Sequence, residues 1–199
     1  MSAGTGFTGD INELLSALRT FTPRPEIDCE EMPAPAKLAP YGFALTAECF
    51  DGEVEIANGR FVLLHEPGGQ ETWGGDLRAV TFIKADIEQE MGSDPLLPQV
   101  GWSWFEESLS GLSATGLSGT VTLALSSSFG ELADRQSRSE LEIRASWTPL
   151  AQSVSQVVDH LERWTELLAH CAGLPPISQG DGVRTMIRRS NKDTDVRKR

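Results

Sequence analysis

The chain has 199 residues, of which 39% are apolar and 23% are charged, and its formal net charge is −12. This size and composition predict one compact domain. No apolar run exceeds five residues, far short of the roughly 18–20 that a membrane-spanning helix needs, and no basic segment leads into an apolar run near Met1. We therefore expect neither a membrane helix nor a secretion signal.

Three cysteines, Cys29, Cys49 and Cys171, stand far apart in the sequence. This spacing fits neither a disulfide framework nor a paired C-x-x-C metal site, so we expect a cytoplasmic protein in a reducing compartment. A phosphate-binding G-x-x-x-x-G-K-[ST] loop and calcium-loop carboxylate spacing are also missing from the sequence. We expect no cofactor and no bound metal.

The negative charge is unevenly distributed. The segment 184–199 holds seven basic and two acidic residues, a net of +5, so the other 183 residues carry −17. An acidic body repels a nucleic-acid backbone, which argues against nucleic acid as a partner except through this basic end. We expect 184–199 to form a disordered tail, because it has no apolar periodicity.

The N-terminal part predicts one helix and one irregular connector. Residues 1–9 have no apolar pattern and are expected to be flexible. Asp10 is placed to cap a helix over 10–21, with Glu13 as its capping-box partner and apolar residues at helical spacing. Five of the eleven prolines then fall in 22–40, which predicts an extended connector without regular structure.

Alternation of apolar and polar residues predicts the strands of a sheet. The turn pairs Asp51-Gly52 and Asn58-Gly59 are expected to separate the first three strands, and Pro67 to Gly69 is expected to interrupt the chain after the third. The predicted strand segments are 41–49, 53–57, 61–65, 77–87, 119–129 and 139–147.

Two further helices complete the predicted fold. One opens at Asp94-Pro95 and runs to about Leu109; the other begins at Ser153 with Gln156 as a capping-box residue and stops at Gly173. The order is α, three or four strands, α, two strands, α. Short hairpin links predict a two-layer α+β domain over 10–183, with a mainly antiparallel sheet of five to six strands and helices on one face.

The sequence contains no motif that groups residues into a catalytic site. None of the three histidines has a ligand partner at helical spacing, and there is no G-x-S-x-G nucleophile motif. His65, beside Glu66 at the end of a predicted strand, is the first candidate base if the protein is an enzyme. The sequence favours a protein that is not an enzyme.

The tryptophans suggest a surface for binding. On the helix over 94–109, Trp102 and Phe105 share one stripe with Leu109, whereas Trp104 lies on a different side. One helix on one sheet buries only one stripe fully, so the second must meet the Pro-rich connector, a second subunit or a ligand. Trp73, flanked by glycines in a loop, is a further candidate for interaction.

Several phrases together carry a resemblance to a known family. They are Arg24-Pro25-Glu26-Ile27, Ala39-Pro40-Tyr41, Asp51-Gly52, the stretch from Gly59 to Pro67, Asp94 to Pro98, Gly101 to Trp104, Glu142 to Pro149, and Ala172 to Pro176. Over about residues 10–176 the chain resembles the uncharacterised actinobacterial "domain of unknown function 3000" family. The resemblance implies a bacterial cytosolic protein and implies no particular chemistry.

The predicted element order is also similar to that of the type III secretion chaperone-like fold, whose members are small, acidic, dimeric protein-binding modules. We therefore expect a protein-binding or adaptor domain that contacts a protein partner or itself, with Trp102, Trp104, Trp73 and His65 as candidate interaction residues. The alternative is an enzyme or small-ligand-binding protein with a pocket around His65, Glu66 and Trp73. Free sheet edges and the second tryptophan stripe also suggest a homodimer.

Overall fold

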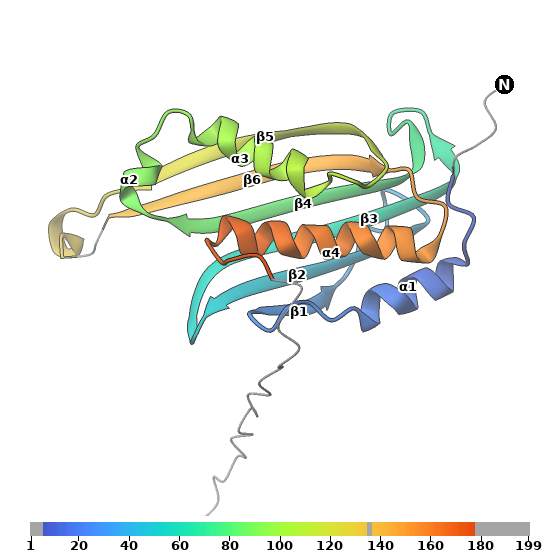
Figure 1. Ribbon diagram of the computed structural model, residues 1–199, viewed down its shortest axis with the longest axis horizontal. Coiled ribbons are helices and arrows are strands. Elements are labelled where there is room, and N and C mark those ends of the chain that lie inside the picture. Colours follow the sequence, from blue (N-terminus) through green and yellow to red (C-terminus); the bar gives the residue numbers. More distant parts are fainter. Residues whose placement is uncertain (1–5, 135–136, 178–199) are drawn as a thin grey trace, which may run out of the picture.

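The computed structural model describes residues 6–134 and 137–177. Its strands form one antiparallel sheet in the order β1-β2-β3-β4-β6-β5, and the helices lie on one face of that sheet (Figure 1). The two-layer α+β prediction is confirmed. The strands are β1 (Ile27–Met32), β2 (Tyr41–Asp51), β3 (Val54–Gln70), β4 (Gly75–Ile87), β5 (Ala114–Ser126) and β6 (Arg138–Pro149). The helices are α1 (Ile11–Thr20), α2 (Gln89–Gly92), α3 (Leu97–Ser108) and α4 (Val154–Cys171), with one 3-10 turn, η1 (Gly130–Leu132).

The helix boundaries follow the capping signals. The Asp10 carboxylate accepts hydrogen bonds from the backbone N–H groups of Asn12 and Glu13, so the cap of α1 is confirmed. Ser153 and Gln156 form the expected capping box at the start of α4. Gly173 follows the end of α4 with a φ of 78°, a conformation that favours glycine. These local bonds satisfy backbone groups that helix ends leave unpaired.

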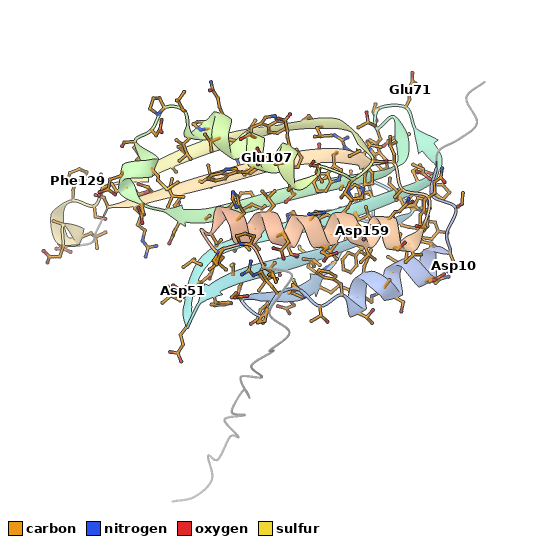
Figure 2. All side chains as sticks on the ribbon, viewed as in Figure 1. Asp10, Asp51, Glu71, Glu107, Phe129 and Asp159 are labelled. Carbon is orange, nitrogen blue, oxygen red and sulfur yellow. The ribbon has the colours of Figure 1, made fainter. Side chains whose placement is uncertain are left out.

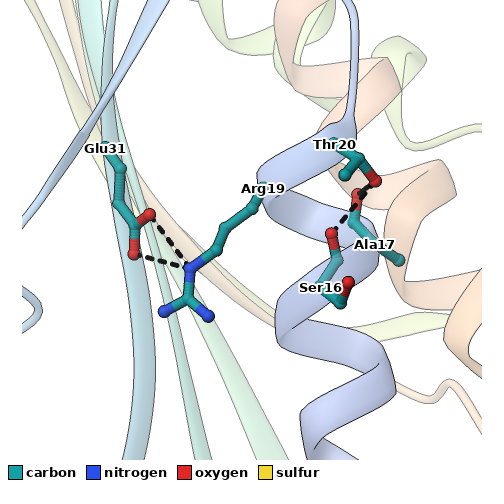
Figure 3. Close-up of polar contacts among 5 residues, drawn as sticks. All are labelled: Ser16, Ala17, Arg19, Thr20 and Glu31. Atoms are coloured by element: carbon teal, nitrogen blue, oxygen red, sulfur yellow. Dashed lines mark hydrogen bonds and ion pairs between the residues drawn. The ribbon is translucent and has the colours of Figure 1, made fainter.

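The prediction that 22–40 lacks regular structure is wrong for its central part. β1 forms there and pairs antiparallel with β2. Its six residues lie between Pro25 and Pro33 and contain no proline, so every backbone N–H needed by an edge strand is present. Arg19 of α1 reaches Glu31 of β1 with an N–O distance of 3.0 Å, which links the first helix to this edge (Figure 3).

The prediction of a turn at Asn58-Gly59 is also wrong. β3 runs through both residues without a break. A Cβ atom at Gly59 would lie 3.0 Å from the Trp164 ring on α4 and 2.9 Å from the Phe82 carbonyl oxygen. The glycine is needed because α4 approaches the sheet closely at this position. Asn58-Gly59 therefore has the sequence of a hairpin turn although its glycine serves helix packing.

The structure describes part of each end of the chain. Residues 178–199, which include the predicted tail, lie outside the described residues, as do residues 1–5. Phe7, within the segment expected to be flexible, donates its backbone N–H to the Asp76 carboxylate and packs against the core. Thr8 hydrogen-bonds to the Gln152 carbonyl.

The core lies between the helices and the sheet, where large aromatic side chains are in contact. Phe61 lies between Trp147 and Trp164, with ring centroids 6.0 and 5.5 Å away. The Trp164 indole N–H donates to the Thr81 hydroxyl, and the Trp147 indole N–H donates to His160 Nδ1 at 3.2 Å. Each buried indole therefore has an acceptor, which removes the cost of burying an unpaired N–H group.

Gly59 gives a direct test of the packing. Replacing Gly59 by Ala is expected to lower the free energy of unfolding by about 2 kcal/mol, because the added methyl group collides with Trp164 and the Phe82 carbonyl. Gly68→Ala is the matched control, since a Cβ there meets nothing within 4 Å. Urea denaturation of both variants makes the comparison. Equal stability of the two would show that α4 does not approach β3 this closely.

His160 predicts a loss of stability in acid. Burial lowers the pKa of His160 from 6.5 to about 4, opposed by Asp159. The folded protein holds His160 in its neutral form. The contribution of this group to the free energy of unfolding is therefore complete above pH 6.5 and is lost as the pH falls through the folded-state pKa near 4, a change of about 3 kcal/mol. His160→Asn keeps an acceptor for Trp147 without a titrating ring. It should flatten the stability profile between pH 6.5 and 4 relative to wild type and to His170→Asn, which removes an exposed histidine. An unchanged acid slope in His160→Asn would assign the loss to other groups.

Candidate functional site

A cleft of about 480 Å³ opens between α3 and the C-terminal half of α4. Trp104 and Glu107 come from α3, while Glu162, Glu166 and His170 come from α4. Figure 2 shows how Glu107 lies on the helix side of the molecule. Arg24, which precedes β1, also lines the cleft, and its side chain is buried. Segments far apart in the sequence therefore meet here.

Arg24 is the buried cation of this cleft, with a side chain only 4% exposed. Its Nε atom lies 3.0 Å from the Glu26 carboxylate, and its Nη1 atom lies 3.7 Å from Glu166 and donates to the Pro175 carbonyl. The hydrogen bond from Arg24 is the largest influence that lowers the pKa of Glu26. The arginine thus joins the segment before β1 to the end of α4.

The wall formed by α4 is acidic. Glu162, Glu166 and His170 follow one another at four-residue spacing, so they share one face of the helix. Burial raises the pKa of Glu166, although Arg24 opposes this effect. Glu166 shares Arg24 with Glu26, whereas Glu107 and Glu162 are exposed. The lining therefore holds three carboxylates and two cations, Arg24 and Arg163.

Trp104 supplies the aromatic wall. Its ring meets the His170 ring edge to face, with centroids 4.9 Å apart. The side of α3 that carries Trp104 therefore packs against α4. The sequence had led us to expect the Pro-rich connector, a second subunit or a ligand in this place. Trp104 is half-buried and its remaining surface lines the cleft.

Trp102 lies on the other side of α3. It contacts Phe105, with ring centroids 5.0 Å apart, and a Cβ atom at Gly119 of β5 would come within 2.9 Å of its ring. The indole thus fills the space above a glycine in β5. Its position indicates a packing role between α3 and the sheet.

His65 is buried at the end of the sheet, beneath two aromatic rings. Tyr41 stacks on it at a centroid distance of 5.8 Å, and Phe7 meets it edge-on at 5.5 Å. Its Nε2 atom is 3.8 Å from Asp76, and neither ring nitrogen has a hydrogen-bond partner among the described residues. Burial lowers the pKa of His65, opposed by Asp76 and Glu66.

Trp73 lies in the turn between β3 and β4, where its carbonyl accepts a hydrogen bond of 2.6 Å from the Thr148 hydroxyl. The four candidate interaction residues therefore have separate surroundings: Trp104 at α4, Trp102 over β5, Trp73 in a hairpin and His65 under Tyr41. The cleft at Trp104 contains none of the three residues of the pocket expected around His65.

Sequence reasoning missed the charged part of the cleft. Arg24 was not singled out, although an arginine between two prolines is held in an extended backbone. The four-residue spacing of Glu162, Glu166 and His170 indicates that they share one helix face. Their meeting with Arg24 depends on how the segment before β1 is held against the end of α4, which no local pattern contains.

Within the described residues, no group of three or more His, Cys, Asp or Glu side chains is placed to hold a metal ion. Cys49 and Cys171 are buried, and burial raises the pKa of these thiols to about 11 and about 12. These two side chains are therefore poor thiolate nucleophiles. Among residues 6–134 and 137–177, no helix is both long and apolar enough to cross a bilayer.

The chain matches the family model described as protein of unknown function DUF3000 over residues 9–183. The protein therefore belongs to this family, as the phrases from Arg24 to Pro176 suggested. Neither the curated proteins nor the solved structures contain a match. The likeness to the type III secretion chaperone fold accordingly stays a prediction.

Arg24 gives a test of the charged cleft. Arg24→Met removes the counter-charge of Glu26 and Glu166, and we expect a loss of about 2 kcal/mol in the free energy of unfolding, reduced from the 3–5 of fully buried pairs by their partial exposure. Adding Glu166→Gln should recover part of this loss. Arg163→Met, which removes an exposed cation from α4, is the control. Chemical denaturation that finds no difference between Arg24→Met and Arg163→Met would contradict the assignment.

Proposed function

We propose that the protein is a protein-binding domain without enzymatic activity, and that the cleft between α3 and α4 takes a segment of the partner. The observation that carries this proposal is the half-buried Trp104 beside a row of carboxylates in one hollow. Tryptophan in a concave surface is typical of residues that dominate the free energy of protein association.

The charges of the cleft indicate the chemistry of the segment. Three glutamates and Arg163 line it together with the buried Arg24, which Glu26 and Glu166 share, so Glu107 and Glu162 are the exposed carboxylates of the cleft. A lysine or arginine of the partner is attracted to these carboxylates and can lie over the Trp104 ring. A phosphate group is repelled by the same carboxylates. The proposed partner is therefore a protein with a basic segment, and not a nucleic acid.

The arrangement gives less support to the alternative of catalysis or small-ligand binding near His65. The Tyr41 and Phe7 rings cover His65, and its nearest carboxylate, on Asp76, is 3.8 Å away and already accepts the Phe7 N–H. A general base must reach the proton that it removes. His65 is instead enclosed by the chain's own side chains.

Trp104→Ala is expected to weaken capture of the partner at least tenfold, since loss of a central interface aromatic costs about 2 kcal/mol or more. The measurement is affinity purification from the native host followed by chemical cross-linking and mass spectrometry. Val54→Ala, at an exposed residue of β3 outside the cleft, is the matched control. Circular dichroism establishes that each variant is folded.

Support for the proposal requires cross-links from the partner's lysines to Glu107, Glu162 or Glu166 that disappear in Trp104→Ala and persist in Val54→Ala. Cross-links confined to other surfaces would contradict it. So would a partner that binds Trp104→Ala and wild type equally, or a metabolite in native mass spectra without any protein partner.

A further inference from the structure

The cleft between α3 and α4 is also the place where the described residues end. Leu174, Pro176 and Ile177 line it, and Ile177 is 58% exposed. Pro175 fixes this segment, because its carbonyl accepts a hydrogen bond of 3.1 Å from the buried Arg24. The residues that follow are therefore attached beside the cleft.

The helices that form the walls of the cleft carry an excess of negative charge. α3 and α4 together contain five acidic residues and one arginine, a net of −4. Arg24 adds no uncompensated positive charge, because Glu26 and Glu166 share it. Glu107 and Glu162 are exposed in the cleft, and neither forms an ion pair with another residue that the structure describes. These two carboxylates are therefore accessible to a cation from another segment.

The sequence after Ile177 complements the cleft in charge and in apolar character. Residues 184–199 carry a net charge of +5. Residues 183–189, the arginine segment, have the sequence Val-Arg-Thr-Met-Ile-Arg-Arg, which combines three arginines with three apolar residues and has no acidic residue. Guanidinium groups stack on aromatic rings and form paired hydrogen bonds with carboxylates. Trp104 and the exposed glutamates supply both kinds of group in the cleft.

The connection between the cleft and the arginine segment is short but long enough. Arg184 is seven positions after Ile177, and an extended chain spans at most about 3.3–3.6 Å per residue, so the connection reaches about 25 Å. The acidic wall from Glu162 to His170 covers eight helical positions, or about 12 Å. A segment on so short a link has an effective concentration near the millimolar range, which favours binding within one chain over binding between copies.

We infer that the cleft holds the arginine segment of its own chain when no partner is bound. The arginines lie against Glu107 and Glu162, and the apolar side chains lie against Trp104. A partner with a basic segment must displace the arginine segment, so its apparent affinity falls with the fraction of molecules whose cleft is free. This regulatory role rests on the proposed function, whereas the docking of the segment does not.

Zero-length cross-linking of the full chain tests the docking. A carbodiimide joins a carboxylate to an amine in contact with it, and Arg188→Lys supplies an amine in the arginine segment while keeping the positive charge. The expected product is a cross-link within one chain from this amine to Glu107 or Glu162, located by mass spectrometry. In 1 M salt, where the screening length is about 3 Å, its yield should fall at least threefold. Lys37, an exposed residue between β1 and β2, is the internal control and should give no cross-link to the cleft.

Three results of this experiment would overturn the inference. One is the absence of any cross-link from the introduced amine to the cleft. Another is a product that joins two chains and so exceeds the 21.6 kDa of one chain, because the cleft would then hold the segment of a second copy. The third is a set of cross-links confined to carboxylates elsewhere, such as Glu30 or Glu48.

Charge reversal in the arginine segment tests the competition with a partner. Arg184→Glu combined with Arg188→Glu places like charges against the exposed glutamates, so the cleft is freed and capture of the partner from the native host should rise at least threefold over wild type. Lys37→Glu, a charge reversal at an exposed lysine outside the arginine segment, is the control and should leave capture at the wild-type level. Equal capture by the two variants would overturn the regulatory role.

Failure of this inference and failure of the proposed function give different results. If the introduced amine cross-links to the cleft but the partner binds Trp104→Ala and wild type equally, the docking stands and the proposed function fails. If the partner's lysines cross-link to the cleft but the introduced amine never does, the proposed function stands and the docking fails.

Discussion

The close contact between α4 and the sheet at Gly59 sets how near α4 lies to the sheet, and the cleft depends on that distance. Trp164 lies directly over a residue with no side chain, so the helix axis comes nearer to β3 and β4 than any other residue at position 59 permits. α3 then packs beside α4, and the space left between their exposed sides is the cleft. A larger residue at position 59 shifts α4 and, with it, Glu162, Glu166 and His170.

The sequence predicted best what is specified by neighbouring residues. The caps of α1 and α4 depend on contacts within three residues, and the alternation in β6 depends on burial of one sheet face. The failures arose where one residue type serves two purposes. Asn58-Gly59 has the composition of a hairpin turn, but its glycine is explained by Trp164, more than a hundred positions later. The prolines around β1 hid a strand because they flank it without interrupting it.

The candidate site was predicted in part, for the same reason. Trp104 was identified because a helix with two apolar stripes needs a second contact, which is a local argument. Which element supplies that contact is a matter of tertiary packing, and the structure assigns it to α4 through His170. Arg24 was missed because its isolated sequence position shows neither its burial nor its two glutamate partners. His65 and Trp73 were grouped because they are close in the sequence. In the structure, His65 contacts the rings of Phe7 and Tyr41, whereas the Trp73 carbonyl accepts a hydrogen bond from Thr148.

The distribution of charge explains how one acidic chain can present two different surfaces. In the cleft, the buried Arg24 is compensated by Glu26 and Glu166 while exposed carboxylates remain at the opening. On the sheet face opposite the helices, Arg144 pairs with Glu142, whereas Arg60 and Arg78 have no carboxylate partner in the described residues. Net charge governs long-range repulsion between copies, but over a contact of a few ångströms the local arrangement decides. Phe82 reinforces this arrangement, because it lies between Arg60 and Arg144 in the strand register and the Arg144 guanidinium lies over its ring. The exposed carboxylates of the cleft and the arginines of the sheet face therefore give two sides of one acidic chain opposite local charge, and each side selects for complementary charge at short range.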